Sequence, residues 1–298
     1  MNTLKTWLPH TQQILNNRLE LALLLLHVLN KPQSFLYAHP EYELTSEQLQ
    51  QLETLVQQRV NGKPMAYILG QKEFWSLNFT VNEYVLIPRP ETELLVETAL
   101  QLLPNEPIHI ADLGTGSGAI AIALAHERPN WQVIATDHSI PALQVAQHNA
   151  KQNNIYNIQF KLGSWCDALP KQKFHAILSN PPYIAEEDPH LQQGDLRFEP
   201  ISALHSPNNG MADIATIATQ ARDYLLPGGL LMLEHGYQQG AEVRSLLQTL
   251  GYQHIQTKQD LAGLERVTFG ILFKKHSNYP RHGEQQQNHA AGSIEPMH

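Results

Sequence analysis

The sequence predicts an α/β protein with a doubly wound, mainly parallel sheet and a small helical domain at its amino end. Strand-like and helix-like segments alternate from residue 108 onward, as expected for a parallel sheet with helices on both faces. The first 70 or so residues show only the helical spacing of apolar residues. With 298 residues, 42% of them hydrophobic, the chain is long enough to form two domains.

Residues 1–72 are expected to form the helical domain. Residues 11–30 carry apolar side chains at helical spacing. A second helix begins at a capping residue, Thr45 or Ser46, and ends at Gly62. Such a domain either packs against the rest of the chain or docks a substrate.

Residues 73–90 are expected to form a hairpin or linker, because apolar and polar residues alternate from Phe74 to Leu86. The domain that carries the sheet is expected at 91–275. Its helices are expected at residues 91–103, 119–127, 141–153, 211–226 and 241–251. Its strands are expected at residues 108–113, 132–137, 158–164, 174–180, 228–236, 254–260 and 266–273.

The composition argues against several classes of function. The net charge of −8, from 28 acidic and 20 basic side chains, argues against salt-driven nucleic-acid binding as the main activity. Cys166 is the one cysteine, which suits a reducing compartment and predicts a cytoplasmic protein. The longest apolar run, 21–29, is far shorter than the roughly 20 residues of a membrane span, so no membrane association is expected.

The polar tail, residues 276–298, is rich in Gln, His, Asn and Gly, and we expect it to be disordered. Its histidines lack the spacing of a zinc site. No metal is expected.

A glycine-rich turn follows the first expected strand and opens a helix. Its residues are Gly114, Thr115, Gly116, Ser117 and Gly118. The glycines permit a tight turn and close approach of a ligand, and the helix N-terminus offers unpaired N–H groups. Dinucleotide-binding folds share this spacing, so the turn alone leaves several nucleoside cofactors open.

Polar and aromatic residues follow the ends of neighbouring strands. Asp137 ends the second strand, where a carboxylate can accept both hydroxyls of a ribose. Asp112 either holds the glycine turn or meets a cationic end of a cofactor. Trp165 follows the third strand and either stacks on an adenine ring or belongs to the core.

The fourth strand ends in the hexapeptide SNPPYI, which contains Asn180, Pro181, Pro182 and Tyr183. The two prolines lack N–H groups and make the segment stiff and extended. Together with the glycine turn, this loop resembles that of S-adenosylmethionine-dependent methyltransferases that alkylate planar nitrogens of adenine, cytosine or glutamine.

Such a nitrogen is a poor nucleophile, because its lone pair is delocalised. The Asn180 side-chain oxygen and the Pro181 carbonyl can accept its two N–H groups, orient it and face the positive charge that develops on it. Tyr183 can stack on the flat substrate group. Alignment of nitrogen, methyl and sulfur would supply much of the remaining acceleration.

Seven segments together resemble the release-factor glutamine methyltransferases, the PrmC/HemK-type family, over about residues 1–273. They are AYILGQKEFW (66–75), IPRPETE (87–93), DLGTGSGAIAIALA (112–125), GSW (163–165), SNPPYI (179–184), RFEP (197–200) and LEHGYQQG (233–240). The resemblance implies a Rossmann-like class I methyltransferase sheet, S-adenosyl-L-methionine as cofactor and class 1 peptide chain release factors as protein substrates. The expected acceptor is the side-chain amide nitrogen of their Gly-Gly-Gln glutamine.

The resemblance also implies roles for single residues. The turn from Gly114 to Gly118, Asp137, Trp165 and Asn180 would contact the cofactor or its methyl end. The loop from Asn180 to Tyr183 would bind the glutamine. The IPRPETE segment would cover the cofactor pocket, with Arg89 and Glu91 as its polar candidates.

Three alternatives explain part of the pattern. A DNA or RNA adenine methyltransferase uses the same loop but should carry a basic recognition surface. An NAD dehydrogenase explains the glycines and Asp137 but leaves the Asn-Pro-Pro-Tyr loop unexplained. A non-catalytic S-adenosylmethionine-binding scaffold is a third class, and the intact Asn180 counts against it.

Overall fold

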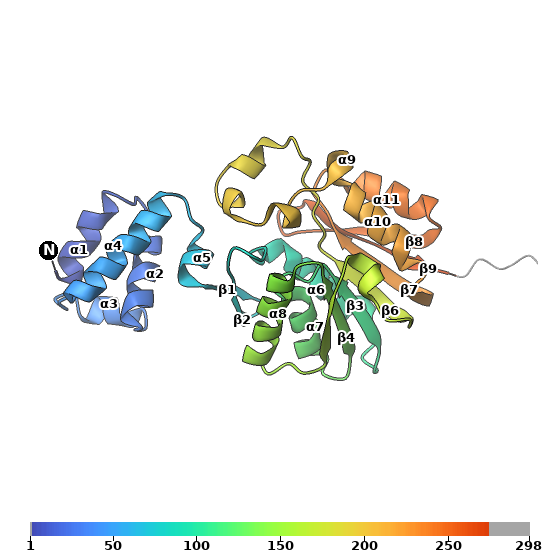
Figure 1. The fold of residues 1–298 in the computed structure, drawn as a ribbon, viewed down its shortest axis with the longest axis horizontal. Coiled ribbons are helices and arrows are strands. Elements are labelled where there is room, and N and C mark those ends of the chain that lie inside the picture. The colour runs from blue at the N-terminus through green and yellow to red at the C-terminus, as the bar shows by residue number, and fades with distance from the viewer. Residues whose placement is uncertain (1, 274–298) are drawn as a thin grey trace, which may run out of the picture.

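The computed structural model describes residues 2–273 and contains a helical domain beside a larger sheet domain (Figure 1). The expected disordered tail lies outside the described residues. The helices of the first domain are α1 (Leu4–Gln12), α2 (Arg18–Leu29), α3 (Ser34–Ala38), α4 (Ser46–Val60) and α5 (Met65–Leu69).

Local signals determine where these helices begin and end. The Asn17 side chain accepts the Glu20 N–H at the start of α2, and Thr45 forms a capping box with Gln48 at the start of α4. Between the helices, leucines such as Leu21 and Leu52 are completely buried. Each such side chain stabilises the domain by about 2 kcal/mol relative to exposure.

A short hairpin connects the two domains. Strands β1 (Gln71–Phe74) and β2 (Leu77–Thr80) pair antiparallel, so the hairpin begins two residues before the expected position. Both turn residues, Trp75 and Ser76, have positive φ, which matches the twist of a two-residue hairpin turn. Phe74 and Phe79 anchor the hairpin in the main core, with their rings edge to face.

The sheet domain contains seven strands in the order β5-β4-β3-β6-β7-β9-β8, and β9 runs antiparallel to both of its neighbours. The strands are β3 (His109–Leu113), β4 (Gln132–Asp137), β5 (Ile158–Leu162), β6 (Phe174–Ser179), β7 (Leu225–Glu234), β8 (Tyr252–Gln259) and β9 (Glu265–Leu272). The predicted doubly wound, mainly parallel sheet is confirmed.

Helices cover both faces of this sheet (Figure 1). They are α6 (Glu93–Leu102), α7 (Ala119–Glu127), α8 (Ile140–Gln152), α9 (Pro207–Gly210), α10 (Ala212–Ala221) and α11 (Gly240–Thr249). The connections contain the short 3-10 helices η1 (Pro90–Thr92), η2 (Trp165–Ala168), η3 (Pro189–Gln192), η4 (Leu196–Phe198) and η5 (Ile201–Ala203). The strand β7 begins before Gly228, earlier than expected, because Leu225 pairs with Phe174 of β6. The apolar residues of α7 are buried on every side, as a helix enclosed by its neighbours requires.

The segment between β6 and α9 reaches from the sheet domain to the helical domain (yellow in Figure 1). Arg197 donates a hydrogen bond of 2.9 Å to the Asn61 carbonyl, and Arg59 forms an ion pair of 3.4 Å with Asp195. Arg59 also binds both carboxylate oxygens of Glu20 within the helical domain, at 2.9 Å each. These contacts fix the helical domain relative to the loop that follows β6.

Candidate functional site

Three strand ends meet at the carboxyl edge of the sheet. Leu113 of β3 pairs in register with Thr136 of β4 and with Ser179 of β6. The next residues along these strands are the predicted site residues Gly114, Asp137 and Asn180. Parallel pairing therefore brings together three residues that are far apart in sequence, at the edge where ligands bind in open α/β sheets.

The glycine turn lies against this edge in a left-handed conformation. Gly114 has a φ of 69°, and a Cβ added there would lie 2.9 Å from the Trp165 ring. The tryptophan therefore packs directly over Gly114 and needs the missing side chain. At Gly116 an added Cβ would meet nothing within 4 Å, so its backbone faces open space.

Two buried carboxylates hold the turn. The Thr115 hydroxyl donates to Asp112 at 2.6 Å, and complete burial raises the pKa of Asp112 to about 7. Asp137 accepts the Gly116 N–H with one oxygen and the Ser139 N–H with the other, both at 2.9 Å. Asp112 therefore supports the turn from behind, while Asp137 ties it to β4.

A cavity of about 480 Å³ opens at this edge. It is lined by six predicted residues, Gly114, Gly116, Asp137, Trp165, Asn180 and Pro182, and by Glu83, Tyr84, Val85, Leu86, His138, Ser139, Ile140, Pro141, Ala142, Pro200, Ser202 and Ala203. The other predicted residues are not among those that line the cavity: Thr115, Ser117 and Pro181 are buried, Tyr183 is half-buried, and Gly118 caps α7.

The Asn-Pro-Pro-Tyr loop is held from several sides. The Ser179 hydroxyl donates to the Leu113 carbonyl at 2.7 Å, which ties the loop to β3. The Gln239 amide donates to the Tyr183 carbonyl at 3.0 Å. Gly210 packs so closely that an added Cβ would lie 2.0 Å from that same carbonyl oxygen. Asn208 and Asn209, just before Gly210, both have left-handed backbone conformations.

Sequence reasoning missed two residues beside Asn180. The Asn180 amide donates from Nδ2 to the Thr92 hydroxyl at 3.1 Å. The Tyr183 hydroxyl donates to Glu234 at 3.4 Å, and burial raises the pKa of Glu234 to about 7. Thr92 and Glu234 both lie in motifs of the family resemblance, but neither motif on its own shows that its residue contacts the Asn-Pro-Pro-Tyr loop.

The IPRPETE segment lies at the rim rather than in the cavity wall. Arg89 forms an ion pair with the buried Glu199, whose other oxygen accepts the Ile87 N–H at 3.1 Å. Burial raises the pKa of Glu199, and Arg89 opposes that rise. The wall itself comes from the residues just before this segment, Glu83 to Leu86.

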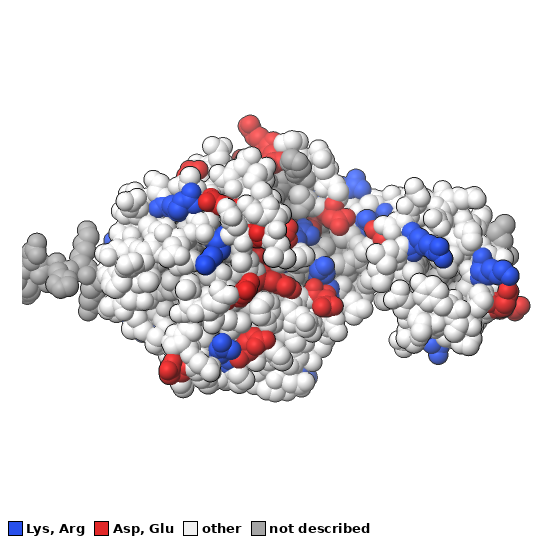
Figure 2. Space-filling view, turned by 180° about the vertical axis from the view of Figure 1, so that it is seen from behind, with Lys and Arg blue, Asp and Glu red and all other residues white. Residues whose placement is uncertain are grey.

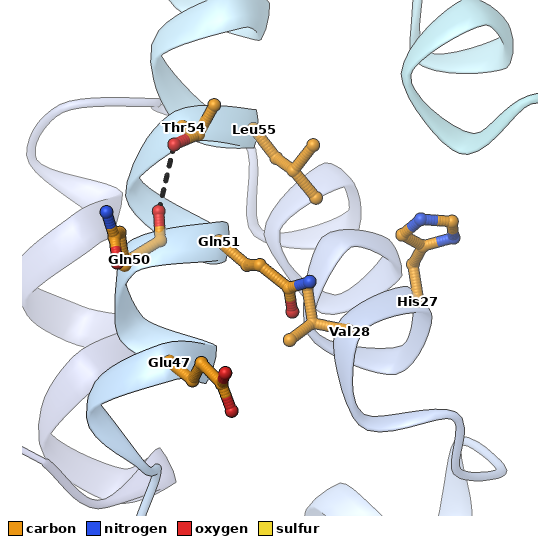
Figure 3. A pocket seen from close by; sticks show the side chains of 7 residues that line it. All are labelled: His27, Val28, Glu47, Gln50, Gln51, Thr54 and Leu55. Atoms are coloured by element: carbon orange, nitrogen blue, oxygen red, sulfur yellow. Dashed lines mark hydrogen bonds between the residues drawn. The ribbon is translucent and has the colours of Figure 1, made fainter.

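A second pocket, of about 450 Å³, lies in the helical domain between α2 and α4. His27 and Val28 line it from α2, and Glu47, Gln51 and Leu55 line it from α4 (Figure 3). It contains none of the strand-end residues, so it is separate from the cavity at the sheet edge.

On the face shown in Figure 2, acidic side chains gather near the middle of the molecule, while Lys and Arg are scattered. Within residues 2–273, no helix is both long and apolar enough to cross a bilayer. The same residues contain no group of three or more His, Cys, Asp or Glu side chains arranged to hold a metal ion.

The polar groups of the cavity fit S-adenosylmethionine better than a dinucleotide. Asp137 accepts one N–H per oxygen, which leaves lone pairs for two ribose hydroxyls. The Gly116 N–H already donates to Asp137, so this N–H is not available to bind a pyrophosphate. Trp165 and Ile140 offer apolar surface for an adenine ring. The sheet and this site together define a class I S-adenosylmethionine-dependent methyltransferase.

Comparisons with known proteins agree with this class. Residues 10–70 match the family model of the PrmC N-terminal domain, and residues 90–195 match that of the methyltransferase small domain. A methyltransferase from Pyrococcus furiosus has a similar fold, with a TM-score of 0.51 and 17% identity, over 72% of this chain and 96% of that one.

Two curated relatives are much more similar in sequence. The release factor glutamine methyltransferase of Coxiella burnetii is 52% identical, over 84% of this chain and 90% of the relative. The Escherichia coli protein of the same name is 50% identical, over 86% of this chain and 93% of the relative. The chain belongs to the family of release factor glutamine methyltransferases, and the resemblance stated from its motifs is confirmed.

Proposed function

We propose that this methyltransferase transfers the methyl group of S-adenosyl-L-methionine to the side-chain amide nitrogen of the Gly-Gly-Gln glutamine in class 1 peptide chain release factors. The observation that carries the proposal is the position of Asn180, which lines the cavity next to the glycine turn and Asp137. The names of the relatives support the release factor as substrate.

The cofactor is proposed to bind at the carboxyl ends of β3 and β4, between the glycine turn, Asp137 and Trp165. Asp137 accepts the ribose hydroxyls, the Gly114–Gly118 turn passes beneath the cofactor, and Trp165 contacts the adenine. When bound, S-adenosylmethionine supplies an electrophilic methyl group.

The proposed role of the Asn-Pro-Pro-Tyr loop is to bind and orient the glutamine amide. Because Nδ2 of Asn180 donates to Thr92, its Oδ1 remains to accept a substrate N–H. The Pro181 carbonyl is the second acceptor. Pro182 and Tyr183 complete the binding surface for the flat amide. The positive charge that grows on the nitrogen then faces two fixed oxygens.

The helical domain, within residues 1–72, is proposed to dock the body of the release factor. Its match to the PrmC N-terminal domain supports this role, and so do the contacts of Arg59 and Asn61 with the loop after β6. Because peptide chain release factors act on ribosomes, the cytoplasm is the proposed location.

The test uses methyl-labelled S-adenosylmethionine with a class 1 release factor, beside the same factor with the Gly-Gly-Gln glutamine changed to alanine. Label on the native factor alone is the expected result. Label on both factors would overturn the proposed acceptor. If the protein binds the cofactor but labels neither factor, the proposed substrate is wrong and the proposed cofactor site is unaffected.

A further inference from the structure

We propose that Gln239 is a positioning residue that holds Tyr183 in place, so that the Tyr183 ring meets the acceptor amide of the substrate. The inference rests on the proposed function, in which Tyr183 belongs to the binding surface for the glutamine. Gln239 lies in the turn between β7 and α11 and is not among the residues that line the cavity, so it acts through Tyr183.

The side-chain amide of Gln239 forms three hydrogen bonds at once. Its Oε1 atom accepts the Gly236 N–H at 2.8 Å, and its Nε2 atom donates to the carbonyls of Tyr183 and Asn209, at 3.0 Å each. These partners fix the orientation of the amide, because a flipped amide would place its oxygen against two carbonyl oxygens. We call Gln239 with these three partners the Gln239 clamp. It joins the loop after β6 to α9 and to the turn after β7.

The backbone of Gln239 is itself held at the start of a helix. Its N–H donates to the Gly236 carbonyl at 2.9 Å, and its carbonyl accepts the Val243 N–H at 3.0 Å in the first turn of α11. A side chain that starts from a regular element positions its partners more precisely than one on a loop. The Tyr183 carbonyl is therefore tied to a fixed part of the sheet domain.

Three consecutive residues with left-handed backbone conformations bring α9 to this clamp. The φ angles are 54° at Asn208, 55° at Asn209 and 85° at Gly210. Such angles are uncommon outside glycine, and asparagine is among the residues that tolerate them. A Cβ at Gly210 would lie 2.7 Å from Gln239 Nε2 and would collide with the Tyr183 carbonyl oxygen. Backbone strain of this kind persists where the surrounding contacts demand it, often at functional sites.

The clamp holds the far end of the Asn-Pro-Pro-Tyr loop. The near end is tied to β3 by the Ser179 hydroxyl, which donates to the Leu113 carbonyl. Between the two ends, the prolines have fixed φ angles, so the loop has few torsions that could absorb a shift at Tyr183. Misplacement of a substrate-positioning group by about 1 Å can cost roughly a hundredfold in rate. Loss of the clamp should therefore reach the substrate through Tyr183.

The first test changes one atom of the clamp. In Gln239→Glu a carboxylate oxygen replaces Nε2, so it cannot donate to either carbonyl. We expect kcat/KM for the release factor to fall roughly ten- to a hundredfold, while the Kd for S-adenosylmethionine stays near its original value. Gln238→Glu is the matched control, because this exposed neighbour donates to the Tyr237 hydroxyl instead and should keep kcat/KM. An unchanged kcat/KM in Gln239→Glu would overturn the proposal.

A double-mutant cycle separates positioning from general structural damage. If Gln239 acts by placing the Tyr183 ring, Gln239→Glu should cost little more once Tyr183→Ala has removed that ring. The same fold loss of kcat/KM with and without the ring would overturn the positioning role. Equal losses of kcat/KM and of S-adenosylmethionine affinity in Gln239→Glu would overturn it as well.

A second readout does not depend on turnover. Tyrosine precedes isoleucine at two positions of the sequence, Tyr67 and Tyr183. In the full chain with ¹³C-carbonyl tyrosine and ¹⁵N-isoleucine, the correlated signals come from these two peptide groups. We expect the Tyr183 carbonyl signal, identified by its loss in Tyr183→Phe, to shift in Gln239→Glu but not in Gln238→Glu. The Tyr67 signal should stay in both, and an unshifted Tyr183 signal in Gln239→Glu would overturn the clamp.

The two readouts separate this inference from the proposed function. If the unaltered protein fails to methylate the release factor, the proposed function fails, and the Tyr183 carbonyl signal still decides whether Gln239 holds this residue. If Gln239→Glu shifts that signal but keeps the kcat/KM of the unaltered protein, the positioning role fails alone.

Discussion

Asn180 is useful in this site because its two amide ends have opposite hydrogen-bonding character. Its Nδ2 atom donates to the Thr92 hydroxyl, which leaves Oδ1 as the acceptor of a residue that lines the cavity. An aspartate at this position could accept from a substrate but could not donate to Thr92. The neighbouring prolines fix the backbone, so the acceptor needs little rearrangement during the reaction.

We expect Asn180→Ala to keep cofactor binding and to lose at least a hundredfold in kcat, as when one stabilising group of a transition state is removed. Calorimetry with S-adenosylmethionine and label transfer to the release factor would measure the two effects. Full activity in this variant would contradict the proposed mechanism.

The pKa of Glu234, raised by burial to about 7, predicts a pH dependence of methyl transfer. The groups that act on it are Thr92, Tyr183, Glu91 and Arg266. The ionised form accepts from the Tyr183 hydroxyl, which lies 3.4 Å from Oε1, and the fraction of this form grows as pH rises through about 7. We therefore expect kcat to increase between pH 6 and pH 8.

Glu234→Gln supplies the control for this dependence. Glutamine keeps the shape and an acceptor oxygen but does not titrate, so the rise in kcat should be flattened. A pH profile of Glu234→Gln that matches the unaltered protein would show that another group is responsible.

Asp112 makes a separate prediction about stability. Burial raises its pKa in the folded state to about 7, from the ordinary value of 3.8 for an aspartate. The folded state therefore binds more protons than the unfolded state between these values, so this residue lowers the free energy of unfolding as pH rises through the interval. We expect Asp112→Asn to gain stability relative to the unaltered protein between pH 5 and pH 7. Urea unfolding at several pH values measures the difference in the free energy of unfolding between Asp112→Asn and the unaltered protein. A difference that does not change with pH would show that Asp112 does not titrate in this range.

At the scale of elements, the strand ends could be predicted from the sequence and the rim of the cavity could not. The residues Gly114, Asp137 and Asn180 follow short apolar strands, and parallel pairing brings such positions together. Thr92 and Glu234 belong to segments whose apolar pattern says nothing of side-chain direction. Their contacts with the loop join positions that are 88 and 51 residues apart.

The ion pair of Arg89, just before η1, with Glu199, just after η4, makes a prediction at the scale of elements. Glu199 is buried beside Arg89 and also accepts the Ile87 N–H, so it joins the RFEP and IPRPETE segments. Arg89→Met leaves this carboxylate without its charge partner, which should cost about 2–3 kcal/mol of the free energy of unfolding. Chemical denaturation measures this loss.

The double variant Arg89→Met with Glu199→Gln serves as the control. The glutamine still accepts from Ile87 without a buried charge, so much of the loss should be recovered. Equal losses in the single and double variants would mean that the ion pair has no part in holding the rim.

At the scale of the whole molecule, the sequence pattern and the chain length predicted two domains, and the structure shows how they are joined. Two of the polar links outside the hairpin are Arg59 with Asp195 and Arg197 with the Asn61 carbonyl. No periodicity marks these residues, because a contact between domains depends on the path of the intervening loop. Their partners lie 136 positions away in the sequence.

These links predict a separation between substrate affinity and chemistry. In a variant with Asp195→Ala and Arg197→Ala, both contacts are lost, but the Arg59–Glu20 pair inside the helical domain remains. The exposed positions of these contacts predict a small loss of stability, roughly 1 kcal/mol or less. A helical domain held by fewer contacts must be ordered further when the release factor binds, so the KM for the release factor should rise several-fold while kcat stays near its original value. Lys5→Ala, which removes an exposed ion pair with Glu41 far from the loop, should leave both constants unchanged. A fall in kcat at unchanged KM would show that the loop after β6 acts on the chemistry rather than on docking.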